Sequence, residues 1–379
     1  MASALRKFTP IRPPEAVDDF VVGARVDADR RHGRGAEANR SGRFEPIERT
    51  QFDDGWATID FLPPLRTEVQ EEKPRKIITT NDSPDISFDR SINPYRGCEH
   101  GCSYCFARPT HAYMGLSPGL DFETKLFAKP TAAKLLRREL AKPGYEPRTM
   151  AIGTNTDPYQ PIERRYRIMR EVLEVLDETS HPVGIVTKSA LVTRDIDILS
   201  RMAKRGLVKV ALSVTTLDRA LARAMEPRAA TPQRRIDALR QLHEAGVPTT
   251  IMVAPVIPAL NEAEIERILE IGASVGVKEA GYVLLRLPLE VKDIFIDFLN
   301  REYPDRAKHV ISVIKTMRGG KEYDSKWGER QTGTGPYAWQ IGRRFEIAAR
   351  RLGLNAERRK LRTDLFVAPK EETDQLSLF

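Results

Sequence analysis

The three cysteines of this 379-residue chain all lie within eight positions, as Cys98, Cys102 and Cys105. This triplet constrains the fold, because one short loop must bring three thiols together. A structural zinc site takes four ligands in a closed tetrahedron, and a [4Fe–4S] cube is normally held by four thiolates. Three thiolates on a cube would leave one iron open to a ligand that is not protein.

Other interpretations of the triplet stay open. With His100 or His111 as a fourth ligand, the thiols would form a Cys3His zinc site. They would otherwise be small buried apolar side chains. A disulfide is disfavoured by the odd number of cysteines and by the lack of a recognisable signal peptide.

The residues around the triplet resemble the radical S-adenosylmethionine (SAM) superfamily. Tyr104 precedes the last cysteine, and the flanking segments are 93–97 (NPYRG) and 106–108 (FAR). Together with later strand ends, they resemble the spore photoproduct lyase-related family, also called DNA repair photolyases, over roughly residues 85–290.

The resemblance implies the cofactors and the reaction. Cys98, Cys102 and Cys105 would hold a [4Fe–4S] cluster, and the amino and carboxylate groups of SAM would chelate the open iron. An electron from a donor such as flavodoxin or ferredoxin would then cleave SAM and release a 5′-deoxyadenosyl radical. The protein would supply orientation and exclusion of water. Such a cluster needs reduced thiols, so we expect a cytoplasmic protein.

Composition adds weaker limits. The chain has no run of about 18 apolar residues, so we expect no membrane partner or membrane-spanning segment. The formal net charge of +8 mildly favours a polyanion such as DNA as partner.

The chain divides into four segments. Residues 1–75 carry the basic run 30–34 and few periodic apolar positions, so we expect a poorly ordered basic extension, with a nucleic-acid-contacting arm as the alternative. Residues 76–317 alternate strand-like and helix-like stretches, which predicts βα units around a parallel sheet. Residues 318–368 form an aromatic and basic helical segment, and 369–379 form a flexible tail.

Short apolar runs predict buried parallel strands at 149–153, 183–187, 208–214, 249–254 and 281–286. A first strand near 91–96 gives six βα units, the number in the partial (β/α)6 TIM-type barrel that the resemblance implies. Among helix starts, Thr131 and Thr231 are predicted N-caps, and Asn261 with Glu264 predicts a capping box.

Ligands of such a sheet sit at the carboxyl ends of its strands. The second strand runs into 154–160 (TNTDPYQ). Many superfamily members hold the amino group of SAM here with Gly-Gly-Glu, which this chain lacks. By similarity Thr156 and Asp157 take that place, with a solvated turn as the alternative.

The later strand ends supply further candidate cofactor-binding residues. Lys188 would direct its ammonium toward a carboxylate, unless it extends to the surface. By resemblance, Ser213 would face the ribose and the backbone at Ala254 the adenine. Arg286 would contact a carboxylate or a phosphate.

The chain departs from spore photoproduct lyases in one respect. Those enzymes return a hydrogen atom to the product radical from a further cysteine, and Thr154 stands at that position here. A threonine O–H bond is too strong to donate hydrogen readily, so we do not expect spore photoproduct as substrate. Tyr113 or Tyr159 would serve as the catalytic radical relay instead, with simple packing as the alternative.

The chain ends in a peptide that resembles the motif with which bacterial repair proteins bind the DNA sliding clamp. Its residues are Gln375, Leu376, Ser377, Leu378 and Phe379. Three apolar anchors on a polar tail would suit a pocket of another protein. The alternatives are a chance sequence or a tail that folds back onto its own domain.

The segment 318–362 combines aromatic side chains with arginines and lysines, which suits stacked bases and phosphates. A helix that packs against the sheet is the alternative. The sequence therefore predicts a lyase-like radical SAM enzyme that acts on damaged or modified DNA. The alternatives are modification of RNA, a peptide or a small metabolite, and a zinc-stabilised DNA-binding adaptor without enzyme activity.

Overall fold

The computed structural model describes residues 21–22, 26, 28–45, 50–51 and 64–370. Its main sheet has seven strands in the order β12-β11-β10-β9-β8-β5-β4. The six strands from β5 to β12 are parallel neighbours in chain order, and β4 pairs antiparallel with β5. Their bounds are Ile78–Thr80 (β4), Arg90–Ile92 (β5), Met150–Ile152 (β8), Val183–Thr187 (β9), Val208–Ser213 (β10), Thr249–Val256 (β11) and Glu279–Leu284 (β12).

The predicted α/β fold is confirmed. All six predicted parallel strands are present, and the sheet is an open one, as expected for a partial TIM-type barrel. Ile152, Ile185 and Val210 lie side by side on adjacent strands and are almost fully buried. Branched side chains of this kind pack well on a pleated surface, which explains why the apolar runs form strands.

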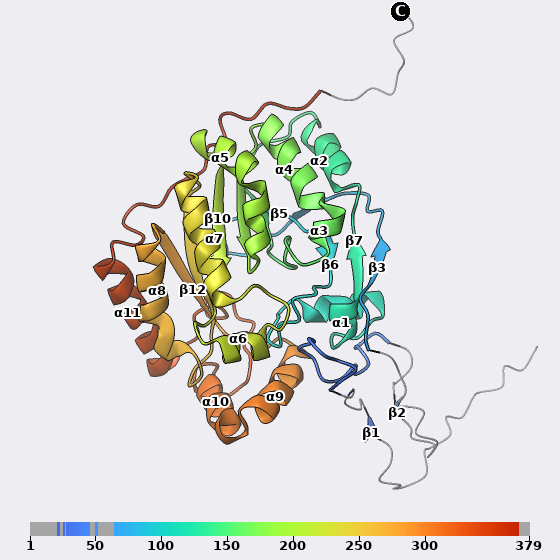
Figure 1. Cartoon of the computed structure of the whole chain (residues 1–379), viewed down its shortest axis with the longest axis vertical. Coiled ribbons are helices and arrows are strands. Elements are labelled where there is room, and N and C mark those ends of the chain that lie inside the picture. Colours follow the sequence, from blue (N-terminus) through green and yellow to red (C-terminus); the bar gives the residue numbers. More distant parts are fainter. Residues whose placement is uncertain (1–20, 23–25, 27, 46–49, 52–63, 371–379) are drawn as a thin grey trace, which may run out of the picture.

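Helices cover the outer face of the sheet (Figure 1). They are α2 (Ala132–Leu140), α4 (Ile168–Glu178), α5 (Ile196–Lys204), α7 (Pro232–Glu244), α8 (Ile265–Ser274) and α11 (Gly335–Arg351). At the lower end of the molecule in Figure 1 lie α6 (Arg219–Met225), α9 (Val291–Glu302) and α10 (Pro304–Thr316). The short helices are α1 (Asp121–Thr124), α3 (Glu163–Tyr166) and the 3-10 helices η2 (Arg108–Met114), η3 (Ala190–Asp195) and η4 (Glu262–Glu264).

The predicted helix starts have mixed outcomes. Thr231 caps α7 by accepting a hydrogen bond from the Arg234 amide, whereas Thr131 precedes α2 without a side-chain cap. The predicted capping box at Asn261 is wrong. Its buried amide instead donates to the carbonyls of Thr215 and Pro255, at 2.7 and 3.0 Å. Buried carbonyls need donors, and Asn261 supplies them where β10 and β11 end.

Two smaller sheets flank this core. A three-stranded sheet has the order β3-β7-β6, with bounds Glu68–Glu71, Lys125–Ala128 and Tyr95–Arg96. The pair β1 (Val21–Val22) and β2 (Thr50–Gln51) is antiparallel.

Part of the N-terminal segment packs onto the protein. Arg34, Ala36 and Glu37 are buried, and the guanidinium of Arg34 donates to the carbonyl of Glu123 at 2.8 Å. These residues differ from the poorly ordered extension expected for residues 1–75, because the interior supplies partners for their polar groups.

Two further expectations concern the C-terminal peptide and membrane crossing. The clamp-like peptide Gln375–Phe379 lies outside the described residues, so clamp binding stays a prediction. Within residues 64–370 and the shorter described stretches, no helix has the length and apolar character needed to cross a membrane.

Candidate functional site

The three cysteines lie on one loop that follows β5 and β6, at the carboxyl end of the parallel sheet. Cys98 and Cys102 are buried, and Cys105 is partly buried. The loop turns sharply at Gly97 and Gly101, whose φ angles are 72° and 67°. Such angles favour glycine, and a Cβ atom at Gly97 would also meet the Phe122 carbonyl oxygen at 2.9 Å. The two glycines thus allow the loop to gather the thiols.

The environment of the thiols suits an iron–sulfur cluster. Burial raises the pKa of all three thiols, and the neighbouring thiols raise the pKa of Cys98 further, after the charge of Asp157. The thiolate is the form that binds metal, so these side chains need a cation beside them. Cluster iron would supply that positive charge.

The structure does not favour the zinc alternative. His100 lies against Asp157, with 3.4 Å between Nδ1 and Oδ2, and Nε2 of His111 is 2.9 Å from the carbonyl oxygen of Lys125. In the part of the chain that the structure describes, no group of three or more His, Cys, Asp or Glu side chains converges on a single ion. Thiolates that bind different irons of a cube need no such convergence.

Asp157 connects the cysteine loop to two strands. Its Oδ1 accepts hydrogen bonds from the Thr187 hydroxyl and the Tyr159 amide, at 2.7 and 2.9 Å, and its Oδ2 accepts one from the Lys188 amide at 2.7 Å. Burial raises its pKa, but the charge of His100 and these hydrogen bonds outweigh burial and lower the pKa to about 2. The carboxylate is therefore ionised.

Thr156 lies beside Asp157 and is 1% exposed. Its hydroxyl donates to the carbonyl of Tyr95 at 2.8 Å, so this side chain holds β6 against the end of β8. The predicted roles of Thr156 and Asp157 in binding the amino group of SAM stay predictions.

The partly buried Lys188 side chain turns toward the cysteine loop. Its half-buried ammonium lies 5.7 Å from the centre of the Tyr104 ring, a cation–π distance. Its charge is among the causes that lower the pKa values of Cys102 and Cys105. The prediction that Lys188 faces the site is consistent with this position.

A buried ion pair that the sequence did not indicate lies beneath Tyr104. Glu226 pairs with Arg235 and accepts hydrogen bonds from the hydroxyls of Tyr104 and Thr215. Burial raises the pKa of Glu226, but Arg235 and then Lys188 outweigh burial and lower the pKa to about 2. Neither member of the pair follows a predicted strand, so no sequence signal marked them.

A second buried ion pair holds the opposite side of the loop. The Nε of Arg108 donates to the carbonyl of Cys102 at 2.9 Å, and its Nη2 lies 2.5 Å from the carboxylate of Glu123. That carboxylate also accepts the amides of Gly35 and Ala36, each at 2.9 Å. Both charged side chains are fully buried, and the sequence singled out Arg108 only as part of a flanking segment.

Three predicted residues lie at the ends of later strands. The Ser213 carbonyl accepts a hydrogen bond from Arg235 at 3.0 Å, and the Ala254 carbonyl accepts one from Thr215 at 3.2 Å. Arg286 follows β12, and its guanidinium lies 4.9 Å from the ring centre of Phe106. Contacts of these residues with SAM remain predictions.

The two tyrosines predicted as radical relays are placed differently. Tyr113 is 71% exposed and stacks on Phe44, with 5.3 Å between ring centres. Tyr159 is buried, and its hydroxyl donates to Asp195 at 3.1 Å. Only the Tyr159 amide reaches the site, through Asp157. These contacts are compatible with simple packing, and the predicted role of either tyrosine as a radical relay stays a prediction.

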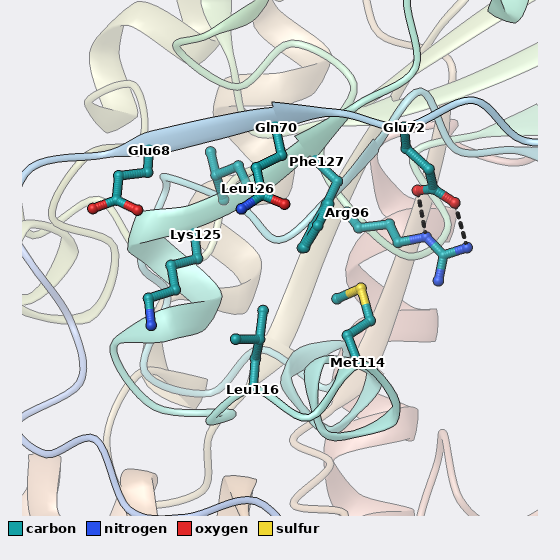
Figure 2. Close-up of a pocket in the computed structure, with 9 residues that line it drawn as sticks. All are labelled: Glu68, Gln70, Glu72, Arg96, Met114, Leu116, Lys125, Leu126 and Phe127. Carbon is teal, nitrogen blue, oxygen red and sulfur yellow. Dashed lines mark hydrogen bonds and ion pairs between the residues drawn. The ribbon is translucent and has the colours of Figure 1, made fainter. Parts of the chain in front are cut away.

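A pocket elsewhere lies on the three-stranded sheet (Figure 2). Glu68 and Gln70 of β3, with Glu72 directly after that strand, line the pocket together with Lys125, and Arg96 pairs with Glu72 at 2.9 Å. It contains no cysteine and no residue from a carboxyl end of the main sheet. We therefore place the candidate site at the cysteine loop.

Residues 92–271 match the Radical SAM superfamily. The chain carries a radical SAM domain, and the cofactors of such domains are a [4Fe–4S] cluster and SAM. The predicted superfamily and its cofactors are thus confirmed.

Curated relatives are similar to parts of the chain. An uncharacterized protein of Mycobacterium tuberculosis is 37% identical over 222 residues, which cover 58% of this chain and 65% of that protein. An uncharacterized protein of Methanocaldococcus jannaschii is 27% identical, over 52% of this chain and 71% of that protein. The radical SAM Nalpha-GlyT isomerase of Pseudomonas phage M6 is 24% identical, over 82% of this chain and 64% of that protein. The chain thus spans less than two thirds of the Mycobacterium protein.

Among solved structures, spore photoproduct lyase complexed with dinucleoside spore photoproduct has a similar fold. Its TM-score is 0.55 at 17% sequence identity, over 76% of this chain and 80% of that chain. This likeness supports the architecture of the open parallel sheet.

Proposed function

We propose that this protein is a radical SAM enzyme that abstracts hydrogen from damaged or modified DNA. The observation that carries the proposal is the gathering of Cys98, Cys102 and Cys105 on one buried loop at the carboxyl ends of six parallel strands. These thiolates would hold the [4Fe–4S] cluster, with flavodoxin or ferredoxin as electron donor. When bound, the cluster and SAM supply reductive cleavage of SAM and hydrogen-atom abstraction.

The side chains around the loop have distinct roles in this proposal. Lys188 neutralises the carboxylate of SAM, and Asp157, ionised at neutral pH, attracts its amino group. Arg108 and Glu123 hold the loop rigid. The apolar side chains of α9 and α10 pack with Cys102 and Tyr104, and they keep water away from this side of the cysteine loop.

Three separate features support DNA as the substrate class. Spore photoproduct lyase, which has a similar fold, has been solved with a dinucleoside. The net charge of +8 favours a polyanion, and the C-terminal peptide resembles a clamp-binding motif. Because all three cysteines lie in the loop, none is left to return hydrogen to a product radical. The expected lesion therefore differs from spore photoproduct.

Transfer of deuterium from DNA tests this proposal directly. The reconstituted enzyme would be incubated anaerobically with dithionite, SAM and irradiated or chemically modified DNA that is uniformly deuterated. We expect the mass of 5′-deoxyadenosine to rise by one deuterium. SAM cleavage without deuterium transfer from any DNA preparation would contradict DNA as the substrate, and deuterated RNA, peptides and metabolites would then be compared.

A further inference from the structure

Arg286 stands at the carboxyl end of β12 with most of its hydrogen-bonding capacity unused. Its Nε is buried and has no partner among the described residues. The hydrogen bond that its guanidinium makes, to the Tyr323 hydroxyl, is long at 3.4 Å. A buried guanidinium nitrogen without a partner is costly, so this side chain is arranged for a ligand.

An acidic side chain near Arg286, Asp85, is already occupied. The pKa of Asp85 is lowered first by a hydrogen bond from the Gly328 amide, at 2.6 Å, and by its contact with Arg330, and the charge of Arg286 is a lesser cause. Within the described ranges, no carboxylate lies within ion-pair distance of Arg286. Its positive charge is therefore not neutralised by a direct ion pair.

A second cation, Arg318, and an exposed aromatic ring, Phe106, lie near Arg286 and form one corner of the molecule with it. Arg318 is 3% exposed; burial lowers its pKa, and the charge of Arg286 lowers it further, against an opposing effect of Tyr323. Phe106 directly follows Cys105, is 44% exposed, and has its ring centre 4.9 Å from the Arg286 guanidinium. An anion placed here would relieve the repulsion between the two guanidinium groups.

The position of Arg286 favours a substrate anion over the carboxylate of SAM. The Lys188 ammonium lies 5.7 Å from the ring centre of Tyr104, which stands in the loop between Cys102 and Cys105, whereas the Arg286 guanidinium lies beside Phe106, beyond the last cysteine. SAM must lie next to the cluster, so Lys188 is the better partner for its carboxylate. Arg286 instead lies against the ring of Phe106, which directly follows the last cysteine of the loop.

We propose that Arg286 and Phe106 form a substrate subsite that binds one phosphodiester and stacks the adjacent unpaired base. The inference rests on the proposed function and names the part of the substrate that this corner recognises. A guanidinium binds a phosphate with two parallel N–H donors, and an exposed ring accepts any base face. The reacting nucleotide would then lie next to the cysteine loop.

The test measures binding of a short fluorescent single-stranded oligodeoxynucleotide to the cluster-loaded full chain, without SAM, over a range of salt concentrations. Arg286→Gln should weaken binding about tenfold and reduce the salt slope by about one. Phe106→Leu should weaken binding at least about fivefold and leave the salt slope unchanged. Arg286→Lys, which keeps the charge, should restore the slope and only part of the affinity.

Arg240→Gln is the matched control, because it removes one positive charge from α7, where Arg240 pairs with Asp237 at 3.0 Å on the surface. It should bind the oligonucleotide as the wild type does. SAM binding, measured by equilibrium dialysis, should be the same in Arg286→Gln and the wild type. Iron content and circular dichroism would verify that each variant is folded and loaded.

The outcomes separate this subsite from the proposed function. If Arg286→Gln and Phe106→Leu bind the oligonucleotide as tightly as the wild type, or if Arg286→Gln loses SAM binding instead, the subsite is wrong and a DNA substrate stands. If the wild type binds no oligonucleotide and takes no deuterium from DNA, both proposals fail together.

Discussion

The two sides of the cysteine loop differ in how completely their charged groups are paired. On one side Arg108 donates to the Cys102, Pro118 and Gly119 carbonyls and to Glu123. On the other side the Lys188 ammonium faces only the ring of Tyr104 and makes no hydrogen bond or ion pair with the described residues.

This difference suits the two residues to different roles: Arg108 supports the loop, and Lys188 can bind a ligand. A buried guanidinium whose three nitrogens all donate hydrogen bonds fixes the backbone that carries the thiols, and it has little capacity left for a ligand. A half-buried ammonium without an ion-pair partner adds little to the fold, and it keeps its full capacity for an anion. Support and binding should therefore respond differently to substitution.

The largest expected effect is on the paired side. Arg108→Met should lower the free energy of unfolding by about 3–5 kcal/mol, because it leaves the buried carboxylate of Glu123 without its cation. Denaturant titration of the protein before reconstitution would measure it. The surface change Arg343→Met is the control and should alter stability little. Equal effects of the two changes would contradict the supporting role of Arg108.

A smaller effect is expected where the N-terminal segment meets the loop. A Cβ atom at Gly35 would lie 1.7 Å from the carbonyl oxygen of Gly101. Gly35→Ala should therefore cost about 1–3 kcal/mol and reduce the iron retained after reconstitution. In Gly184→Ala the nearest atom to the new Cβ, apart from chain neighbours, is 4.0 Å away, so this control should retain iron normally. Full iron retention in Gly35→Ala would show that the segment does not support the loop.

The smallest effect on stability is expected on the unpaired side. Lys188→Met should change the free energy of unfolding by less than about 1 kcal/mol, since Lys188 makes no ion pair with the described residues and the buried Glu226 keeps Arg235 as its direct partner. The affinity for SAM should nevertheless fall about tenfold or more, the usual effect of losing a hydrogen bond between charged groups. Equilibrium dialysis would measure the affinity for SAM. Lys209→Met, near the start of β10 and away from its carboxyl end, is the control. If Lys188→Met greatly lowered the stability but left the affinity for SAM normal, Lys188 would be a supporting residue like Arg108, and the comparison would be wrong.

Most of the fold could be predicted from the sequence. Runs such as 183–187 and 208–214 alternate between fully buried and less buried positions, with Val183, Ile185 and Val210 among the buried ones, and this pattern is local. The position of Lys188 at the site followed from the same rule, since a residue directly after a parallel strand lies at its carboxyl end.

The supporting network could not be predicted in this way. Glu123 and Gly35 are 88 positions apart, and Tyr104 and Glu226 are 122 apart. Such contacts depend on how distant segments meet, and no local period or spacing records them. Asn261 was misread for the same reason, because its amide satisfies buried carbonyls of other segments and not the start of its own helix.

The central claim is that Cys98, Cys102 and Cys105 hold a cluster with one iron open to SAM. The most direct measurement is the iron, sulfide and zinc content of the anaerobically reconstituted protein, with the EPR spectrum of the reduced form recorded with and without SAM. We predict about four irons and four sulfides per chain and a spectrum that SAM changes, all lost when the three cysteines are replaced by alanine. Stoichiometric zinc without sulfide, and no effect of SAM, would contradict the account.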